Sequence, residues 1–153
     1  MARRTCERCR RPESVCVCSR LPTSKIVLPT KVMVISHPCE KKKRMIGTVP
    51  LIDLCLANYE LLELPADPLD SNNHIKGCLR DFPSLQHALL DKSTVLLYPG
   101  PHAVAIEQLP SPPGAAQRTL IVVDGTWRQA AKIMREDSIQ KVRFARGVFS
   151  IGL

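Results

Sequence analysis

Short apolar runs alternate with polar, turn-forming segments along most of the chain. Four of these runs are rich in apolar and β-branched residues and precede polar or turn-forming residues, as strands do: 32–35, 59–64, 94–98 and 119–123. The last two are continuously apolar, which is typical of strands that are buried on both faces. A final strand is predicted at 141–144.

In the intervals between these runs, apolar residues recur with helical spacing. The segments 48–58, 84–90 and 127–135 are predicted helices, and 65–81 is a polar, turn-rich loop. Strands that alternate with helices predict an α/β fold with a mostly parallel, helix-covered sheet. The chain contains neither GxGxxG nor a phosphate-loop motif, so a standard dinucleotide-binding fold and a nucleoside triphosphatase are not supported.

The first 25 residues differ from the rest of the chain. They are rich in Arg and Cys and lack apolar periodicity, so a hydrophobic core cannot order them. The length of 153 residues suits one α/β domain and is too short for two full-sized domains. We therefore expect a small Cys-rich unit at 1–25 and an α/β domain at 26–153.

Four cysteines within this first unit have the spacing of a structural zinc site. They form the pattern Cys6-x2-Cys9-x6-Cys16-x-Cys18, and four thiolates in tetrahedral array are a usual structural zinc set. Neighbouring arginines would favour the thiolate form. The alternative is a flexible tail whose thiols bind nothing. Because four protein thiolates leave no open coordination position, zinc would be structural here.

Positive charge is concentrated in the first third of the chain. Lys and Arg number 22 against 14 Asp and Glu, a net charge of +8. Counting along the sequence, residues 1–50 hold 12 basic and 3 acidic residues (net +9), and 51–153 hold 10 and 11 (net −1). This favours a polyanion such as nucleic acid as partner, with a solvated basic tail as the alternative.

No stretch approaches the roughly 18 consecutive apolar residues that a membrane-spanning helix requires, and no signal-peptide pattern follows Met1. We expect a soluble, intracellular protein of the nucleus or cytoplasm, without a membrane partner.

Three short segments follow predicted strands at their carboxyl ends, where open α/β sheets bind ligands: 37–40, 98–100 and 124–127. Thr126 and Gln129 fit a capping box that begins a helix, which places Asp124 beside a helix N-terminus. Each residue also has a simpler interpretation. Asp124 could only bond the turn, Trp127 could belong to the core, and His37 could be a loop histidine whose bonds are satisfied.

In this order, the motifs resemble those of DTW-domain proteins. The resemblance rests on the Cys pattern with Pro12, on His37-Pro38-x-Glu40 with Thr48, on residues 97–100, and on Val123-Asp124-Gly125-Thr126-Trp127-Arg128-Gln129-Ala130. It implies a tRNA-uridine aminocarboxypropyltransferase with a SPOUT-like α/β fold. It further implies transfer of the 3-amino-3-carboxypropyl group from S-adenosylmethionine to N3 of a tRNA uridine, with release of methylthioadenosine.

The resemblance also implies roles for particular residues. Asp124 would be the general base, since N3 of uridine carries a weakly acidic proton. The donor pocket would be lined by Thr48, Leu97, Pro99, Gly100, Thr126 and Trp127. The tRNA would be held by Arg8, Arg10, Arg11, His37, Lys41, Lys42, Lys43 and Arg44, so its binding should weaken as salt rises.

The sequence departs from the family pattern after the third predicted helix. Family members continue into a Ser-Thr-x-Glu-Ala motif that completes the donor site, and this motif is absent. We expect the domain to lack its C-terminal knot segment, residues 148–153 to be a tail outside the family pattern, and activity to be weak or absent. The alternatives are a non-catalytic tRNA-binding form and a SPOUT-type RNA methyltransferase.

Overall fold

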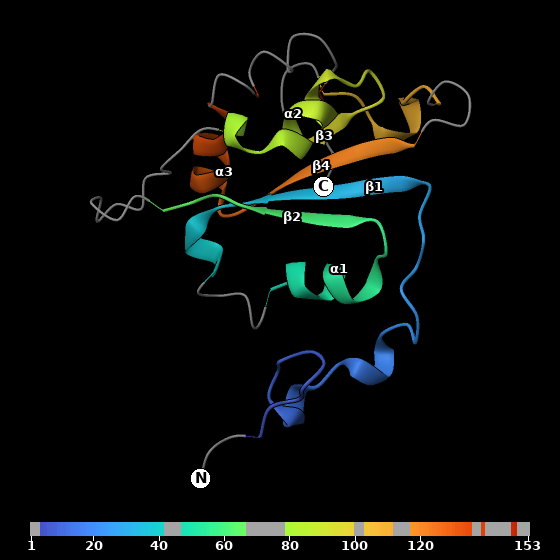
Figure 1. The fold of residues 1–153 in the computed structure, drawn as a ribbon, viewed down its shortest axis with the longest axis vertical. Coiled ribbons are helices and arrows are strands. Elements are labelled where there is room, and N and C mark those ends of the chain that lie inside the picture. The colour runs from blue at the N-terminus through green and yellow to red at the C-terminus, as the bar shows by residue number, and fades with distance from the viewer. Residues whose placement is uncertain are drawn as a thin grey trace.

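The computed structural model describes residues 4–41, 47–66, 79–99, 103–111, 117–135, 139 and 148–149. Its centre is a twisted sheet in the order β2-β1-β4-β3-β5, in which every neighbouring pair is parallel (Figure 1). The strands are β1 (Thr30–Ser36), β2 (Tyr59–Glu63), β3 (Val95–Leu97), β4 (Arg118–Asp124) and β5 (Val148–Phe149).

Helices cover both faces of this sheet, because β1 presents alternate apolar side chains to opposite sides. Val32 and Val34 pack with Val49 of α1 on one face, whereas Met33 and Ile35 belong to a larger cluster with α2 and α3 on the other. The α-helices are α1 (Val49–Cys55), α2 (Pro83–Leu90) and α3 (Trp127–Met134). Short 3-10 helices are η1 (Glu13–Val15), η2 (Cys18–Arg20), η4 (Leu79–Asp81) and η5 (Ile106–Gln108).

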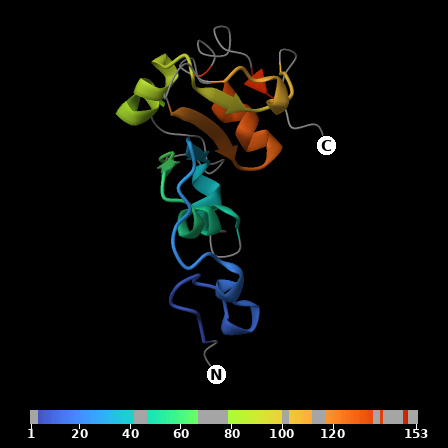
Figure 2. The ribbon, with the colours of Figure 1, turned by 90° about the vertical axis from the view of Figure 1, so that its right-hand side faces the viewer.

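The Cys-rich N-terminal segment lies beyond α1, on the side of α1 that faces away from the sheet (Figures 1 and 2). Helix α1 is therefore sandwiched between this segment and the sheet. Among the helices of the described ranges, none combines the length and hydrophobicity that crossing a bilayer demands.

The predicted α/β fold with a parallel sheet is confirmed, with some shifted boundaries. The predicted helix 48–58 already ends at Cys55, because Leu56 is extended and bridges Ile26. The predicted strand 141–144 lies outside the described residues. Residues 148–149, which we expected to lie in a tail outside the family pattern, form β5 beside β3.

Candidate functional site

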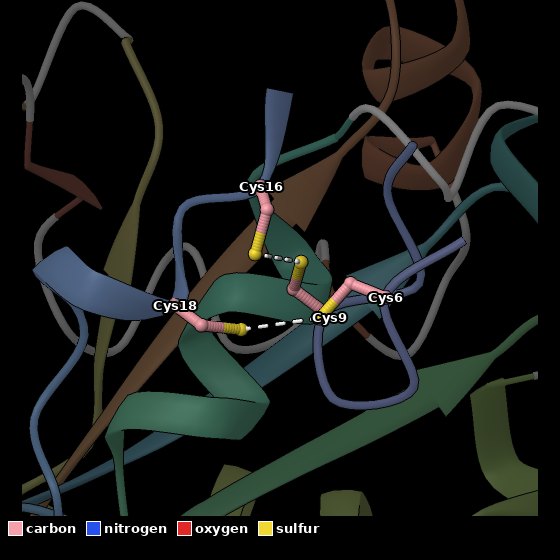
Figure 3. Close-up of side chains that lie close together, drawn as sticks. All are labelled: Cys6, Cys9, Cys16 and Cys18. Atoms are coloured by element: carbon pink, nitrogen blue, oxygen red, sulfur yellow. Dashed lines mark hydrogen bonds between the residues drawn. The ribbon is translucent and has the colours of Figure 1, made fainter. Parts of the chain in front are cut away.

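The four cysteines of the N-terminal segment converge on one point (Figure 3). Their sulfurs all lie within 4.8 Å of one another. The Sγ atoms of Cys6 and Cys18 are 3.5 Å apart, and those of Cys9 and Cys16 are 3.8 Å apart. Zinc–sulfur bonds of about 2.3 Å in tetrahedral geometry would place neighbouring sulfurs about 3.8 Å apart. The donor set and its spacing therefore fit a structural zinc ion.

Backbone hydrogen bonds shape this cluster into a tight loop, which we call the knuckle (residues 4–18). The Cys6 N–H donates to the Arg11 carbonyl at 2.8 Å, and the Arg10 N–H donates to the Cys6 carbonyl at 2.9 Å. Arg10 adopts a left-handed conformation with φ of 59°, which is uncommon for a non-glycine residue. The turn after Cys9 is thus held by the fold of the knuckle.

The thiols of this cluster differ in pKa. The Arg11 N–H, aided by neighbouring donors, lowers the pKa of Cys9 to about 6 despite burial. Burial, together with the adjacent thiols, raises the pKa of Cys18 to about 12. Four thiolates repel one another without a cation, whereas a divalent metal stabilises all of them.

A second group of candidate residues meets where β1 and β4 end. The register pairs Ser36 with Asp124, and the Ser36 hydroxyl donates to Asp124 Oδ2 at 2.9 Å. The His37 N–H donates to the Asp124 carbonyl at 3.0 Å. Segments 37–40 and 124–127 therefore adjoin at the carboxyl edge of the sheet, as parallel strands require.

His37 is buried at this edge, with 2% of its surface exposed. Its Nδ1 accepts the Cys39 N–H at 3.2 Å, and no described residue bonds its buried Nε2. Burial and the charge of Lys132 lower the pKa of His37, while Glu40 opposes this shift. His37 is therefore a buried residue of this edge, and its contact with tRNA stays a prediction.

Gly125 allows the two segments to approach this closely. A Cβ atom at this position would lie 3.1 Å from Gln129 Cβ and Oε1 and 3.3 Å from His37 Cβ. These separations are tighter than most Cβ contacts, so a side chain at this position would require Gln129 or His37 to shift.

The first turn of α3 contains the predicted capping box. The Thr126 N–H donates to Gln129 Oε1 at 2.6 Å, and the Gln129 N–H donates to Thr126 Oγ1 at 3.4 Å. Trp127 is 69% exposed, so the interpretation of Trp127 as a core residue is wrong. An exposed indole at the edge that holds Asp124 is available to stack on a planar ligand.

Of the other predicted pocket residues, the structure describes Thr48, Leu97 and Pro99. Thr48 is exposed and precedes α1, where its carbonyl accepts the Leu51 and Ile52 N–H groups and its hydroxyl makes no cap. Leu97 ends β3 beside Val122 and is half-buried, and Pro99 is exposed. Gly100 lies outside the described residues.

The predicted RNA-binding residues divide between the knuckle and the loop after β1. Arg8 donates to the Pro22 carbonyl at 2.7 Å, and Arg11 donates to the Gly47 carbonyl at 3.4 Å. Arg10 is exposed. Lys41 forms an ion pair with Glu63 at 3.5 Å. Lys42, Lys43 and Arg44 lie outside the described residues.

Sequence reasoning missed two features of these sites. The first is Ser36, whose signal was a polar residue that ends an apolar run immediately before His37. The second is a cleft between the knuckle and α1, lined in part by Arg8 and Arg10. No local pattern could have indicated the cleft, because its walls are some forty residues apart in sequence.

Comparison with known proteins agrees with the motifs. The DTW domain family model matches residues 3–146. The tRNA-uridine aminocarboxypropyltransferase 2 of Macaca fascicularis is 32% identical over 134 residues, which cover 88% of this chain and 42% of that protein. The enzyme of the same name from Drosophila melanogaster is 32% identical over 131 residues, 86% of this chain and 48% of that protein.

A plant relative extends the same comparison. The tRNA-uridine aminocarboxypropyltransferase A of Arabidopsis thaliana is 26% identical over 151 residues, 90% of this chain and 52% of that protein. No solved structure matches. The chain thus spans about half the length of the curated relatives it matches. With a family model that matches most of its length, this chain belongs to the DTW-domain family.

Proposed function

We propose that this chain carries the core of a tRNA-uridine aminocarboxypropyltransferase. The donor would be S-adenosylmethionine, and the acceptor would be N3 of a uridine in tRNA. The observation that carries the proposal is the shared carboxyl edge, where Asp124, the buried His37 and the exposed Trp127 adjoin in a chain of the DTW-domain family.

The proposed reaction is a single displacement at carbon. The uridine N3–H passes its proton to the Asp124 carboxylate, and the N3 electron pair forms a bond to the sulfonium-bound methylene carbon of the aminocarboxypropyl group. The carbon–sulfur bond breaks with its electron pair on sulfur, and methylthioadenosine leaves. A positioned carboxylate is suited to this proton transfer, and the protein selects among the three carbons on sulfur by orienting the donor.

The remaining expectations form part of the same proposal. Residues Thr48, Leu97, Pro99, Gly100, Thr126 and Trp127 would line the donor pocket of a SPOUT-like domain at 26–153. The knuckle, within a unit at 1–25, would hold structural zinc and contact tRNA phosphates. With a tRNA substrate, we expect the protein to act in the nucleus or cytoplasm.

Product mass tests the proposal. The zinc-loaded chain is incubated with unmodified tRNA and S-adenosylmethionine, and nucleosides are analysed by mass spectrometry, with the Drosophila relative as positive control. An aminocarboxypropyl adduct on uridine supports the proposal. A methyl adduct would contradict the proposal and indicate RNA methyl transfer. The absence of any adduct, while the control enzyme is active, would contradict the proposal in favour of a non-catalytic tRNA-binding form.

A further inference from the structure

A cleft of about 600 Å³ lies between the knuckle and the outer side of α1 and β2. This volume is within the range of small-ligand sites, roughly 300–1,000 Å³. One wall comes from the knuckle, and the other comes from the α/β domain. The lining residues are Arg8, Cys9, Arg10, Val49, Pro50, Asp53, Leu54, Tyr59, Glu60 and Leu61.

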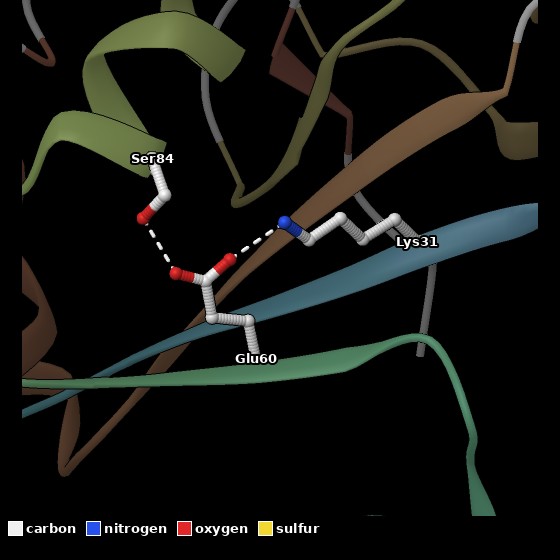
Figure 4. Close-up of polar contacts among 3 residues, drawn as sticks. All are labelled: Lys31, Glu60 and Ser84. Carbon is white, nitrogen blue, oxygen red and sulfur yellow. Dashed lines mark hydrogen bonds and ion pairs between the residues drawn. The ribbon is translucent and has the colours of Figure 1, made fainter.

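The acidic residues of the cleft are already compensated by lysines that do not line it. Asp53 forms an ion pair with Lys25 at 3.4 Å. Glu60 accepts bonds from Lys31 at 2.6 Å and from the Ser84 hydroxyl at 2.5 Å (Figure 4), and these partners lower its pKa against the effect of burial. The carboxylates therefore add little net negative charge to the cleft.

The arginines on the opposite wall have no such compensation. Arg8 donates to the neutral Pro22 carbonyl, and the described part of the chain contains no ion pair with Arg8 or Arg10. A guanidinium with free donors binds phosphate oxygens well. The knuckle wall thus presents two guanidinium groups that have no carboxylate partner among the described residues to whatever occupies the cleft.

The wall from α1 and β2 is largely apolar and includes one aromatic ring. Val49, Pro50, Leu54 and Tyr59 contribute to it. An occupant that suits both walls carries an anionic group on one side and a flat, weakly polar ring on the other. A nucleotide with an unpaired base has this chemistry, whereas paired bases in a duplex are already stacked inside the helix.

We propose that this cleft binds an unpaired nucleotide of RNA, with its phosphate on Arg8 and Arg10 and its base against the α1 wall. The inference rests on the proposed function only in taking RNA as the partner. The inference also means that a bound zinc ion would support RNA binding by ordering the knuckle. Because Arg8 and Arg10 flank Cys9 on the knuckle loop, the ordered knuckle sets the position of both guanidinium groups.

Binding of a short single strand tests the inference. Fluorescence anisotropy is measured with fluorescein-labelled hexauridylate and the zinc-loaded chain, without a group donor. Arg10→Gln is compared with Arg20→Gln, which removes the same charge from η2 outside the cleft lining. Arg10→Gln should weaken binding about tenfold and flatten the salt dependence by about 0.7 in log–log slope, while Arg20→Gln should have little effect.

A second pair of measurements separates base recognition from simple charge attraction. Unlabelled hexauridylate should compete better than a polyphosphate of similar charge, and Leu54→Ala should narrow that difference. Arg10→Gly keeps the left-handed backbone favourable and should reproduce the effect of Arg10→Gln, which excludes misfolding as its cause.

Three results would each overturn the inference. They are equal effects of the Arg10 and Arg20 variants on binding, competition by polyphosphate equal to that by hexauridylate, and binding of an RNA duplex as tight as that of the single strand. Since this binding assay needs no S-adenosylmethionine, its result does not depend on the outcome of the product-mass assay. If the chain binds RNA in the cleft but forms no aminocarboxypropyl product, the inference is supported and the proposed function is contradicted. If the chain forms an aminocarboxypropyl product but the Arg10 and Arg20 variants have equal effects, the proposed function is supported and the inference is contradicted.

Discussion

At the scale of single residues, the contact between Ser36 and Asp124 matters most for the proposed chemistry. The hydroxyl of Ser36 occupies one acceptor site on Asp124 Oδ2. An ionised carboxylate has about four such sites, so the other oxygen can still accept a proton. Ser36 therefore orients the carboxylate without blocking it.

Replacing Asp124 tests its role as general base. Asp124→Asn preserves shape and an acceptor for Ser36 but cannot take the uridine proton, so transfer should fall about 10²- to 10⁴-fold in the product-mass assay. Hexauridylate binding should stay unchanged. Ser36→Ala, which keeps the carboxylate, should lose less activity. Full transfer by the Asn variant would contradict the assignment.

The buried His37 ring makes stability depend on pH. Its folded-state pKa is lowered from the ordinary 6.5 by burial and Lys132, against the opposing effect of Glu40, so the unfolded chain binds the proton more readily than the folded chain. The stabilisation is present above about pH 6.5 and is lost as pH falls below it.

Urea unfolding at pH 7.5 and pH 5.5 measures this dependence. His37→Gln should show a smaller loss of unfolding free energy between the two pH values than the parent chain does. His87→Gln is the matched control, because His87 is exposed, and it should behave like the parent. Identical losses in all three chains would show that His37 does not titrate in this way.

At the scale of elements, the knuckle is the part of the chain whose order we expect to depend on a bound metal ion. Helices η1 and η2 bury no residue, so hydrophobic packing contributes little to their order. The α/β domain has its own apolar clusters on both faces of the sheet. Loss of metal should therefore unfold the knuckle and leave the sheet intact.

Cys9→Ser tests this separation. The variant should lose its zinc, measured by atomic absorption, and should bind hexauridylate more weakly, while its far-UV circular dichroism keeps the α/β signal. Cys55→Ser is the control, since Cys55 belongs to α1 and not to the cluster, and it should retain one zinc ion per chain. Full zinc content in Cys9→Ser would refute the four-thiolate site.

At the scale of the whole molecule, the sheet separates two apolar clusters that share no residue. Ile133 is fully buried in the larger cluster with α2 and α3, and Val49 belongs to the smaller one beneath α1. Side chains on opposite faces of β1 and β4 do not touch. The two faces should therefore contribute to stability independently.

Chemical denaturation of single and double variants measures this independence. Ile133→Ala should cost about 2–5 kcal/mol of unfolding free energy, and Val49→Ala about 1–2 kcal/mol. The double variant should show the sum of the two within about 0.5 kcal/mol. A much larger deviation would mean that the clusters are coupled through the sheet.

The strands, the helices and the capping box of α3 could be predicted from the sequence because each depends on residues that are close together in the chain. Apolar runs placed β1 and β4, and the three-residue spacing of Thr126 and Gln129 predicted the capping box. Boundaries set by distant partners were missed: α1 ends early because Leu56 pairs with Ile26. The strand predicted at 141–144 remains untested.

By itself, the sequence determined the α/β alternation, the four metal-ligand candidates and the concentration of charge in the first third, since each depends on neighbours within a few positions. Tertiary structure alone decided that Ser36 bonds Asp124 across 88 positions, that His37 is buried, and that the knuckle arginines face α1 across a cleft. These contacts follow from parallel strand pairing and from packing between segments far apart in the chain, which no short pattern encodes.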